Sequence, residues 1–180
     1  MPKKILVIGS SNTDMTIKGE HLPLPGETVL GGDFTMGPGG KGANQAVAAK
    51  RLGGDVTFVC KVGRDLFGDN AVSLYEEEGI DTSHILRSDK PSGTALILVD
   101  AKAENCISVA PGANGDITVK DIEAIAPVIE ASDIVILQLE IPVPAVQAAV
   151  EIAHKAGKYV ILNPAPACEL PKDIFANISL

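Results

Sequence analysis

Short apolar segments alternate with helical segments along most of this chain, and this alternation constrains the fold more than any other feature. Apolar runs at residues 4–9, 56–62, 134–139 and 159–163 predict buried strands, and residues 178–180 predict the start of another. Strands and helices that alternate at short spacing form open parallel sheets with right-handed crossovers. The sequence therefore predicts a Rossmann-like α/β fold, with an open, mostly parallel sheet flanked by helices.

Four segments between these runs carry helix signals. Helices are expected at residues 40–52, 67–78, 118–130 and 144–156. Glycines follow the first, second and fourth, as is typical of helix C-termini, and the fourth begins after prolines. Thr118 is suited to cap the third.

Two segments do not follow the alternation of strands and helices and favour β-structure instead. Residues 15–36 hold two prolines between β-prone pieces at 16–17 and 27–30, and residues 93–110 predict a hairpin with strands at 94–100 and 105–110. Neither suits a crossover helix. We expect one domain over residues 1–180, with these two segments forming a small β-sheet that serves as a lid or an oligomer interface. The alternative is two long connecting hairpins without a function.

Charge and composition exclude several classes of partner. The formal net charge of −8 argues against a nucleic-acid or anionic-membrane partner. No apolar run reaches the ~18 residues of a membrane span, and no signal peptide is recognisable before the first strand. The cysteines are far apart in sequence, as expected of reduced thiols in a cytoplasmic protein: Cys60, Cys106 and Cys168. No metal-ligand spacing is present, and no metal is expected on this chain.

Polar residues follow the predicted strands at the edge where open α/β sheets bind ligands. Asn12 and Asp14 come after the first strand, and Glu140 comes after the third. Lys41 and Asn44 lie in a glycine-rich segment that opens the first helix, at the positive end of its dipole. Taken singly, Asp14 could be a turn residue and Glu140 a solvated loop charge. Their joint placement favours a site that supplies donors and acceptors to a polyol.

Two common nucleotide-binding motifs are excluded. A dinucleotide fingerprint needs three glycines after the first strand, whereas Gly9 is followed by Ser10 and Ser11. A P-loop needs Ser or Thr after its Gly-Lys pair, whereas Lys41 is followed by Gly42. The glycine-rich segment therefore belongs to another class of site.

The spacing of this segment resembles the N-terminal signature of the phosphofructokinase-B family of sugar kinases. The matching residues are Gly39, Gly40, Gly42, Asn44, Ala46, Gly53 and Gly63. Further stretches resemble the ribokinase branch of that family, and the resemblance covers essentially the whole chain: residues 9–14, 24–28, 40–47, 110–114, 138–140 and 163–167. The resemblance implies an α/β fold bearing a β-sheet lid that also forms the dimer interface.

The same resemblance implies a sugar site and a reaction. The residues that would hold the hydroxyls of D-ribose are Asn12, Asp14, Gly40, Lys41, Asn44 and Glu140. Ala95 and Ile97 would contact the other side of the sugar. The family transfers the γ-phosphoryl group of ATP to the ribose 5-hydroxyl with Mg²⁺, and is activated by a monovalent cation, K⁺.

The chain departs from the family in its second signature, GAGD, which carries the catalytic base. The nearest string, at residues 112–116, follows the predicted hairpin and is interrupted by Asn114, so we interpret it as unrelated. We expect the C-terminal part of the fold, with the base, the nucleotide pocket and the cation loop, to be missing, and this chain alone to be inactive. Expected partners are a sugar, a complementary C-terminal fragment and further copies of the chain, joined through the lid and an exposed sheet edge. The alternatives are a non-catalytic sugar-binding or self-assembling module, and an unrelated α/β nucleotide-binding domain.

Overall fold

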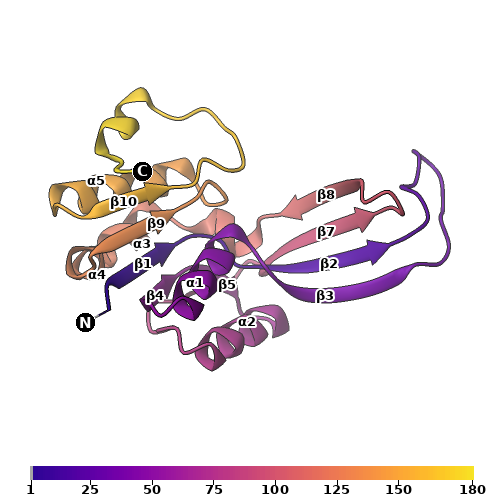
Figure 1. Cartoon of the computed structure of the whole chain (residues 1–180), viewed down its shortest axis with the longest axis horizontal. Coiled ribbons are helices and arrows are strands. Elements are labelled where there is room, and N and C mark those ends of the chain that lie inside the picture. Colours follow the sequence, from indigo (N-terminus) through magenta and orange to yellow (C-terminus); the bar gives the residue numbers. More distant parts are fainter. Residues whose placement is uncertain (1) are drawn as a thin grey trace.

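A four-stranded parallel sheet forms the centre of the body in the computed structural model, which describes residues 2–180 (Figure 1). Its strands are β1 (Lys4–Ile8), β4 (Asp55–Val59), β9 (Ile134–Leu137) and β10 (Tyr159–Leu162), in the order β10-β9-β1-β4. Every neighbouring pair is parallel. The predicted open parallel sheet is confirmed.

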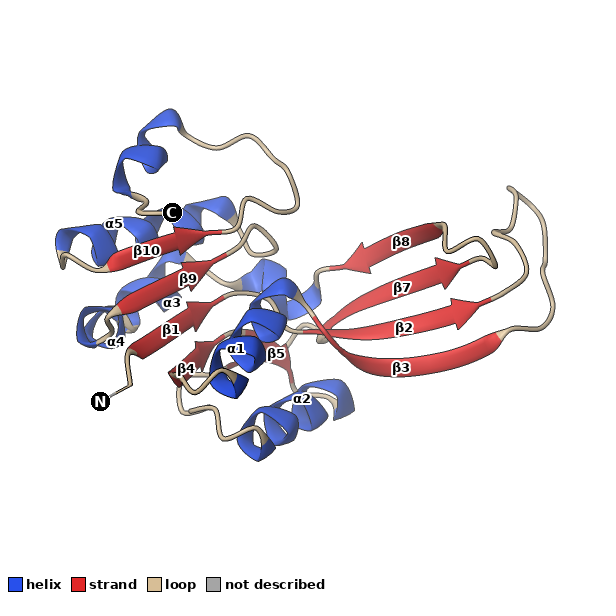
Figure 2. Ribbon diagram, in the orientation of Figure 1, coloured by secondary structure: helices blue, strands red, loops and turns tan. Residues whose placement is uncertain are grey.

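Helices cover the two faces of this sheet (Figure 2). On one face lie α1 (Lys41–Arg51) and α2 (Leu66–Glu77), and on the other α3 (Val119–Ala124), α4 (Ala126–Ala131) and α5 (Val143–Lys155). Side chains along a strand point alternately to the two faces, so each strand contributes to both cores. In β1, Leu6 and Ile8 belong to the α3–α5 core, whereas Val7 belongs to the α1–α2 core.

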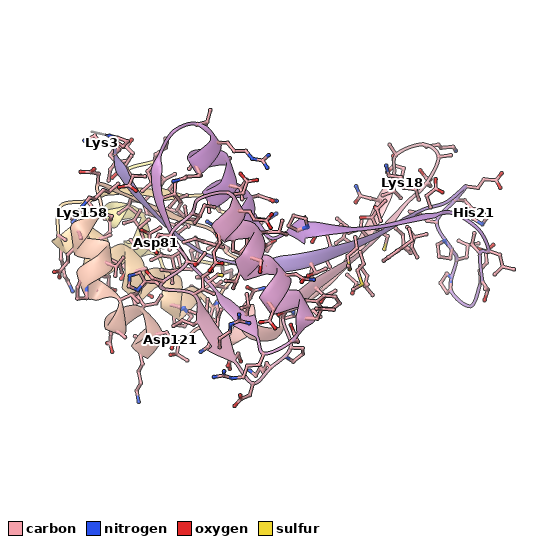
Figure 3. The ribbon with its side chains drawn as sticks, turned by 90° about the horizontal axis from the view of Figure 1, so that it is seen from below. Lys3, Lys18, His21, Asp81, Asp121 and Lys158 are labelled. Atoms are coloured by element: carbon pink, nitrogen blue, oxygen red, sulfur yellow. The ribbon has the colours of Figure 1, made fainter. Side chains whose placement is uncertain are left out.

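A second sheet projects from the body and is built from two segments distant in sequence (Figure 1). Its order is β3-β2-β7-β8, from β2 (Asn12–Lys18), β3 (Asp33–Gly39), β7 (Gly93–Val99) and β8 (Asn105–Ala110). The central pair β2–β7 is parallel and both outer pairs are antiparallel. We call it the projecting sheet. Figure 3 shows Lys18 and His21 at its far end, opposite Lys3 and Lys158 on the body.

The prediction for the two segments of this sheet is partly right. The hairpin at residues 93–110 is confirmed, but residues 27–30 form no strand. The chain returns only at Asp33, which pairs with Lys18. Gly31 and Gly32, with φ of 101° and 100°, make the turn into this strand in a conformation that glycine adopts without strain.

Two predicted elements are each divided in two. The strand expected at residues 56–62 changes partner at Cys60, whose carbonyl accepts from Leu86 N (2.8 Å), so that β5 (Lys61–Gly63) pairs with β6 (Leu86–Ser88) in a separate sheet. The helix expected at 118–130 begins with the predicted Thr118 cap but breaks at Ile125. Pro127 explains the break, because proline cannot donate the backbone hydrogen bond that a continuous helix needs.

The C-terminal residues run along the outer side of β10. Ser179 N donates to Val160 O (2.8 Å) and Leu162 N donates to Leu180 O (3.0 Å), although residues 178–180 are not themselves a strand. Val160 and Leu162 face the α5 side, and side chains alternate along a strand, so Tyr159 faces the opposite side of the sheet. On that side, no helix of residues 2–180 lies over β9 and β10 (Figure 2). Tyr159 is 48% exposed there.

Candidate functional site

A cavity of about 750 Å³ lies where the projecting sheet meets the carboxyl edge of the body sheet. This volume is typical of small-molecule sites, which span roughly 300–1,000 Å³. Every site residue expected from the sequence lines it: Asn12, Asp14, Gly40, Lys41, Asn44, Ala95, Ile97 and Glu140. The structure therefore brings together side chains from β2, α1, β7 and the segment after β9.

The glycines of the α1 N-terminus allow this helix to lie directly against the end of β1. Gly40 has a φ of 93°, and Ala43 N donates to Ser10 O at 2.9 Å. A Cβ atom at Gly42 would lie 2.5 Å from Ser10 N, closer than any side chain could be placed. The first N–H groups of α1 are thus held at the rim of the cavity and are satisfied within the protein: Lys41 N donates to Glu140 Oε2, Gly42 N to Ser10 Oγ and Asn44 N to Gly40 O.

Glu140 joins the segment after β9 to this helix N-terminus. Its Oε2 accepts from Ser10 Oγ (2.6 Å) and from Lys41 N (2.9 Å), while its Oε1 lies 3.5 Å from Lys41 Nζ. Ser10 Oγ in turn accepts from Gly42 N at 3.2 Å. One oxygen of Glu140 is therefore engaged in holding the site together, and Oε1 remains beside Lys41 at the cavity.

Asp14 faces the cavity from β2. Gly39 provides its space, because a Cβ atom there would overlap the Asp14 carboxylate. Burial, and then the negative charge of Glu140, raise the pKa of Asp14, and the positive charge of Lys41 opposes them. The ionised carboxylate is thus held at a cost, which is typical of a group placed for binding rather than for stability.

Beside Asp14, whose register partner on β7 is Ala95, the lining of the cavity is apolar, and this part is larger than the sequence suggested. Ala95 and Ile97 were expected there, but Ile107 and Val109 of β8 also line the cavity. In the register, Ala95 pairs with Val109 and Ile97 with Ile107, so the four side chains share one face. The alternation in β8 was the signal that could have identified the additional pair.

The string at residues 112–116 forms a short 3₁₀ turn rather than a catalytic loop. The Asp116 carboxylate accepts from Ser88 Oγ (2.7 Å) and pairs with Lys90 Nζ (2.9 Å), and it does not line the cavity. Asn114, by contrast, is buried at the cavity and contacts Asn12. In the sequence, Asn114 lies in one of the ribokinase-like stretches and interrupts the string at residues 112–116, but no local pattern reveals its tertiary contacts.

The pattern of the pfkB family carbohydrate kinases matches residues 2–180. The chain belongs to the pfkB family of carbohydrate kinases. This family membership confirms the resemblance found in the sequence, and it rules out the alternative of an unrelated α/β nucleotide-binding domain.

Relatives in the pfkB family place the chain near the ribokinases. Ribokinase from Haemophilus influenzae is 40% identical over 181 residues, which is 100% of this chain and 59% of that protein. Deoxyribokinase from Salmonella typhi is 40% identical over 164 residues, covering 91% of this chain and 54% of that protein. The structure of Arabidopsis thaliana ribokinase complexed with ribose and ATP matches with a TM-score of 0.84 at 28% identity, over 99% of this chain and 59% of that one.

The pfkB relatives are longer than this chain, which spans a little over half of the length of the three described above. The projecting sheet and the body sheet both lie within this chain, and residues from both regions line the cavity. Within residues 2–180, no helix combines the length and the apolar character needed to cross a bilayer.

Proposed function

We propose that the cavity binds D-ribose or a similar sugar, as the sugar-binding N-terminal portion of a ribokinase-like kinase. The observation that carries this proposal is a cavity lined by both polar and aliphatic side chains. Carboxylates, carboxamides and an ammonium group can satisfy several hydroxyls at once, and the aliphatic wall can cover the C–H surface of the ring. Asp14 and Ala95 are partners in the β2–β7 register, so polar and aliphatic side chains lie next to each other in the lining of the cavity.

The proposed roles follow from this division. Six residues hold the hydroxyls: Asn12, Asp14, Gly40, Lys41, Asn44 and Glu140. Ala95 and Ile97, on the projecting sheet, contact the other side of the sugar, so this sheet acts as a lid over the ligand. The lid closes the site by packing aliphatic groups against the ring, and the carboxylate that it places in the cavity, Asp14 of β2, holds a hydroxyl in this proposal rather than accepting the proton of the reacting one.

The family reaction transfers the γ-phosphoryl group of ATP to the sugar, with Mg²⁺ and a monovalent cation such as K⁺. The charged groups that line the cavity are Asp14, Glu140 and Lys41, and Lys41 is already beside Glu140. Two carboxylates and one ammonium group suit a neutral polyol and repel a triphosphate. We therefore propose that residues 2–180 supply the sugar site, whereas the nucleotide, its cations and the catalytic base belong to a C-terminal part of the fold.

Calorimetry with D-ribose tests the sugar site. We expect measurable binding, weakened because the C-terminal part also helps to enclose the sugar, and we expect Asp14→Ala to abolish it. The change Glu151→Gln, at a half-buried residue of α5 that does not line the cavity, is a control that should leave the affinity unchanged. Binding of ATP without any binding of ribose would contradict the proposal.

A coupled assay of ADP formation tests the proposed inactivity. Without a base and an anion-stabilising site, each worth roughly 10²-fold or more, this chain alone should give no ribose-dependent turnover. Adding the separately expressed C-terminal part of the Haemophilus influenzae ribokinase should restore turnover if the two pieces form one site. Turnover by residues 1–180 alone, close to that of the intact relative, would refute the inactivity.

A second proposed function is self-assembly, favoured by apolar side chains that stand exposed on two surfaces. Phe34, Met36 and Leu96 are 62%, 53% and 55% exposed on the projecting sheet, and Tyr159 is 48% exposed beside the sheet edge. Apolar patches and open strand edges promote association between copies of a chain. We propose a homo-oligomer formed through the lid, with further association through the sheet edge beside β10, where residues 178–180 are the outermost segment. Light scattering that finds a monomer at micromolar concentration would contradict it.

A further inference from the structure

The segments that connect the body to the projecting sheet converge on the buried side chain of Asn114. This residue lies in the 3₁₀ turn after β8 and is 1% exposed. It contacts the segment between β1 and β2 at Ser11 and Asn12. Gly93, at the start of β7, packs so closely that a Cβ atom there would overlap the Asn114 amide and the Asn12 carbonyl. Three of the connecting segments thus meet around one side chain.

Backbone groups fix which way the Asn114 amide points. Its Oδ1 accepts from Ser11 N (2.9 Å), and its Nδ2 donates to Ser11 O (3.1 Å). A backbone N–H can only donate and a backbone carbonyl can only accept, so exchanging the oxygen and nitrogen of the amide would break both bonds. The orientation of Asn114 is therefore set by the main chain of Ser11.

The fixed orientation passes to Asn12. Asn114 Nδ2 also donates to Asn12 Oδ1 (2.7 Å), so the Asn12 carbonyl must face Asn114. Asn12 Nδ2 has no hydrogen-bond partner within residues 2–180. Asn12 shares a face of β2 with Asp14 and lines the cavity, so its amino group is the part available to a ligand.

We infer that Asn114 is a positioning residue that fixes the amide of Asn12 so that its NH₂ group, and not its carbonyl, faces the ligand. Asn12 then acts only as a donor, toward an oxygen of the bound molecule. This inference rests on the proposed sugar site for the identity of that oxygen. The Asn114 side chain also connects the ligand site to the base of the lid, because it lies where the segments between the body and the projecting sheet meet.

The change Asn114→Asp tests whether Asn114 orients Asn12 or only fills space in the protein interior. The change keeps the size of the side chain and the acceptor for Ser11 N, but it places a second carboxylate oxygen against Ser11 O and Asn12 Oδ1. The Asn12 amide must turn over to relieve the repulsion, and its carbonyl then faces the cavity. Ser132→Ala is the matched control, because it also removes a buried hydrogen bond (Ser132 Oγ to Ile129 O, 2.7 Å) but lies at the amino edge of the sheet.

The experiment uses protein labelled with ¹⁵N at its seven asparagines and observes their side-chain NH₂ resonances with and without D-ribose. We expect ribose to shift the Asn12 NH₂ pair in the unmodified protein. In Asn114→Asp the Asn12 pair should move in the absence of ribose, and the Kd for ribose should rise roughly tenfold, as for a lost hydrogen bond. Ser132→Ala should change neither. An unchanged Asn12 pair in Asn114→Asp would overturn the inference, even if ribose bound more weakly.

A reciprocal variant covers the case in which Asn114→Asp does not fold. Asn12→Asp retains an acceptor for Asn114 Nδ2 and replaces the donor that faces the cavity. The Asn114 NH₂ pair should keep its position while ribose binding weakens, and a displaced Asn114 pair with unaltered affinity would overturn the inference. If the unmodified protein binds no ribose, the proposed function fails by itself, and the Asn12 resonances in Asn114→Asp still decide the positioning role.

Discussion

Glu140→Gln tests whether the carboxylate after β9 holds the site together. Glu140 Oε2 accepts two charge-assisted hydrogen bonds, from Ser10 Oγ and from Lys41 N. Such bonds contribute about 1.5–3 kcal/mol each, against about 0.5–1.5 kcal/mol for neutral ones. Replacing the carboxylate by a neutral amide should therefore weaken the two bonds by about 2 kcal/mol in total. The charge also lies at the N-terminus of α1, which adds about 0.3–1 kcal/mol. The ion pair with the part-exposed Lys41 adds little.

The expected result is a free energy of unfolding about 2–3 kcal/mol lower at pH 7. Urea denaturation followed by circular dichroism measures it. Glu151→Gln is the matched control, because its carboxylate meets only surface groups on α5 and should change the free energy by less than about 0.5 kcal/mol. If Glu140→Gln were as stable as the control, the two hydrogen bonds at Oε2 would not support the site and the reasoning would be refuted.

Three other changes have defined outcomes. Burial and the charge of Glu140 raise the pKa of Asp14 against the opposing charge of Lys41, so the free energy of unfolding falls as the pH rises through that raised pKa. Asp14→Asn should therefore raise the free energy of unfolding at pH 7, measured by urea denaturation. The same change should weaken ribose binding about 10–150-fold in calorimetry. Gly42→Ala should lower the melting temperature, equivalent to about 1–3 kcal/mol, because its Cβ would meet the main chain of Ser10; an unchanged melting temperature would contradict the close packing. Tyr159→Lys should reduce the average mass in light scattering if the uncovered sheet face drives association, and an unchanged mass would exclude that face.

The sequence was sufficient for the elements whose signals are local. The β1, β9 and β10 strands are continuous apolar runs, and the helices α1, α2 and α5 end at glycines, so periodicity and capping placed them within a few residues. The sequence did not predict where a strand leaves one sheet and pairs with a strand of another. Nothing in the apolar run at residues 56–62 shows that Cys60 leaves the body sheet, because that division depends on pairing with a strand more than 20 residues away.

The sequence by itself indicated the polar residues of the expected site, because glycine spacing and polar residues at strand ends are local features of the chain, whereas Ala95 and Ile97 were expected only from the resemblance to the family. The position of Glu140, whose carboxylate joins Ser10 to the first N–H of α1, was decided only by the tertiary structure. The same holds for Ile107 and Val109, which reach the cavity through the register of β8, and for Asn114. Asn114 lies 102 residues from Asn12 in sequence, and its effect arises only when two connecting segments are brought within hydrogen-bonding distance. Local sequence patterns therefore identified the polar side chains of the expected site, and long-range packing fixed how these side chains are oriented.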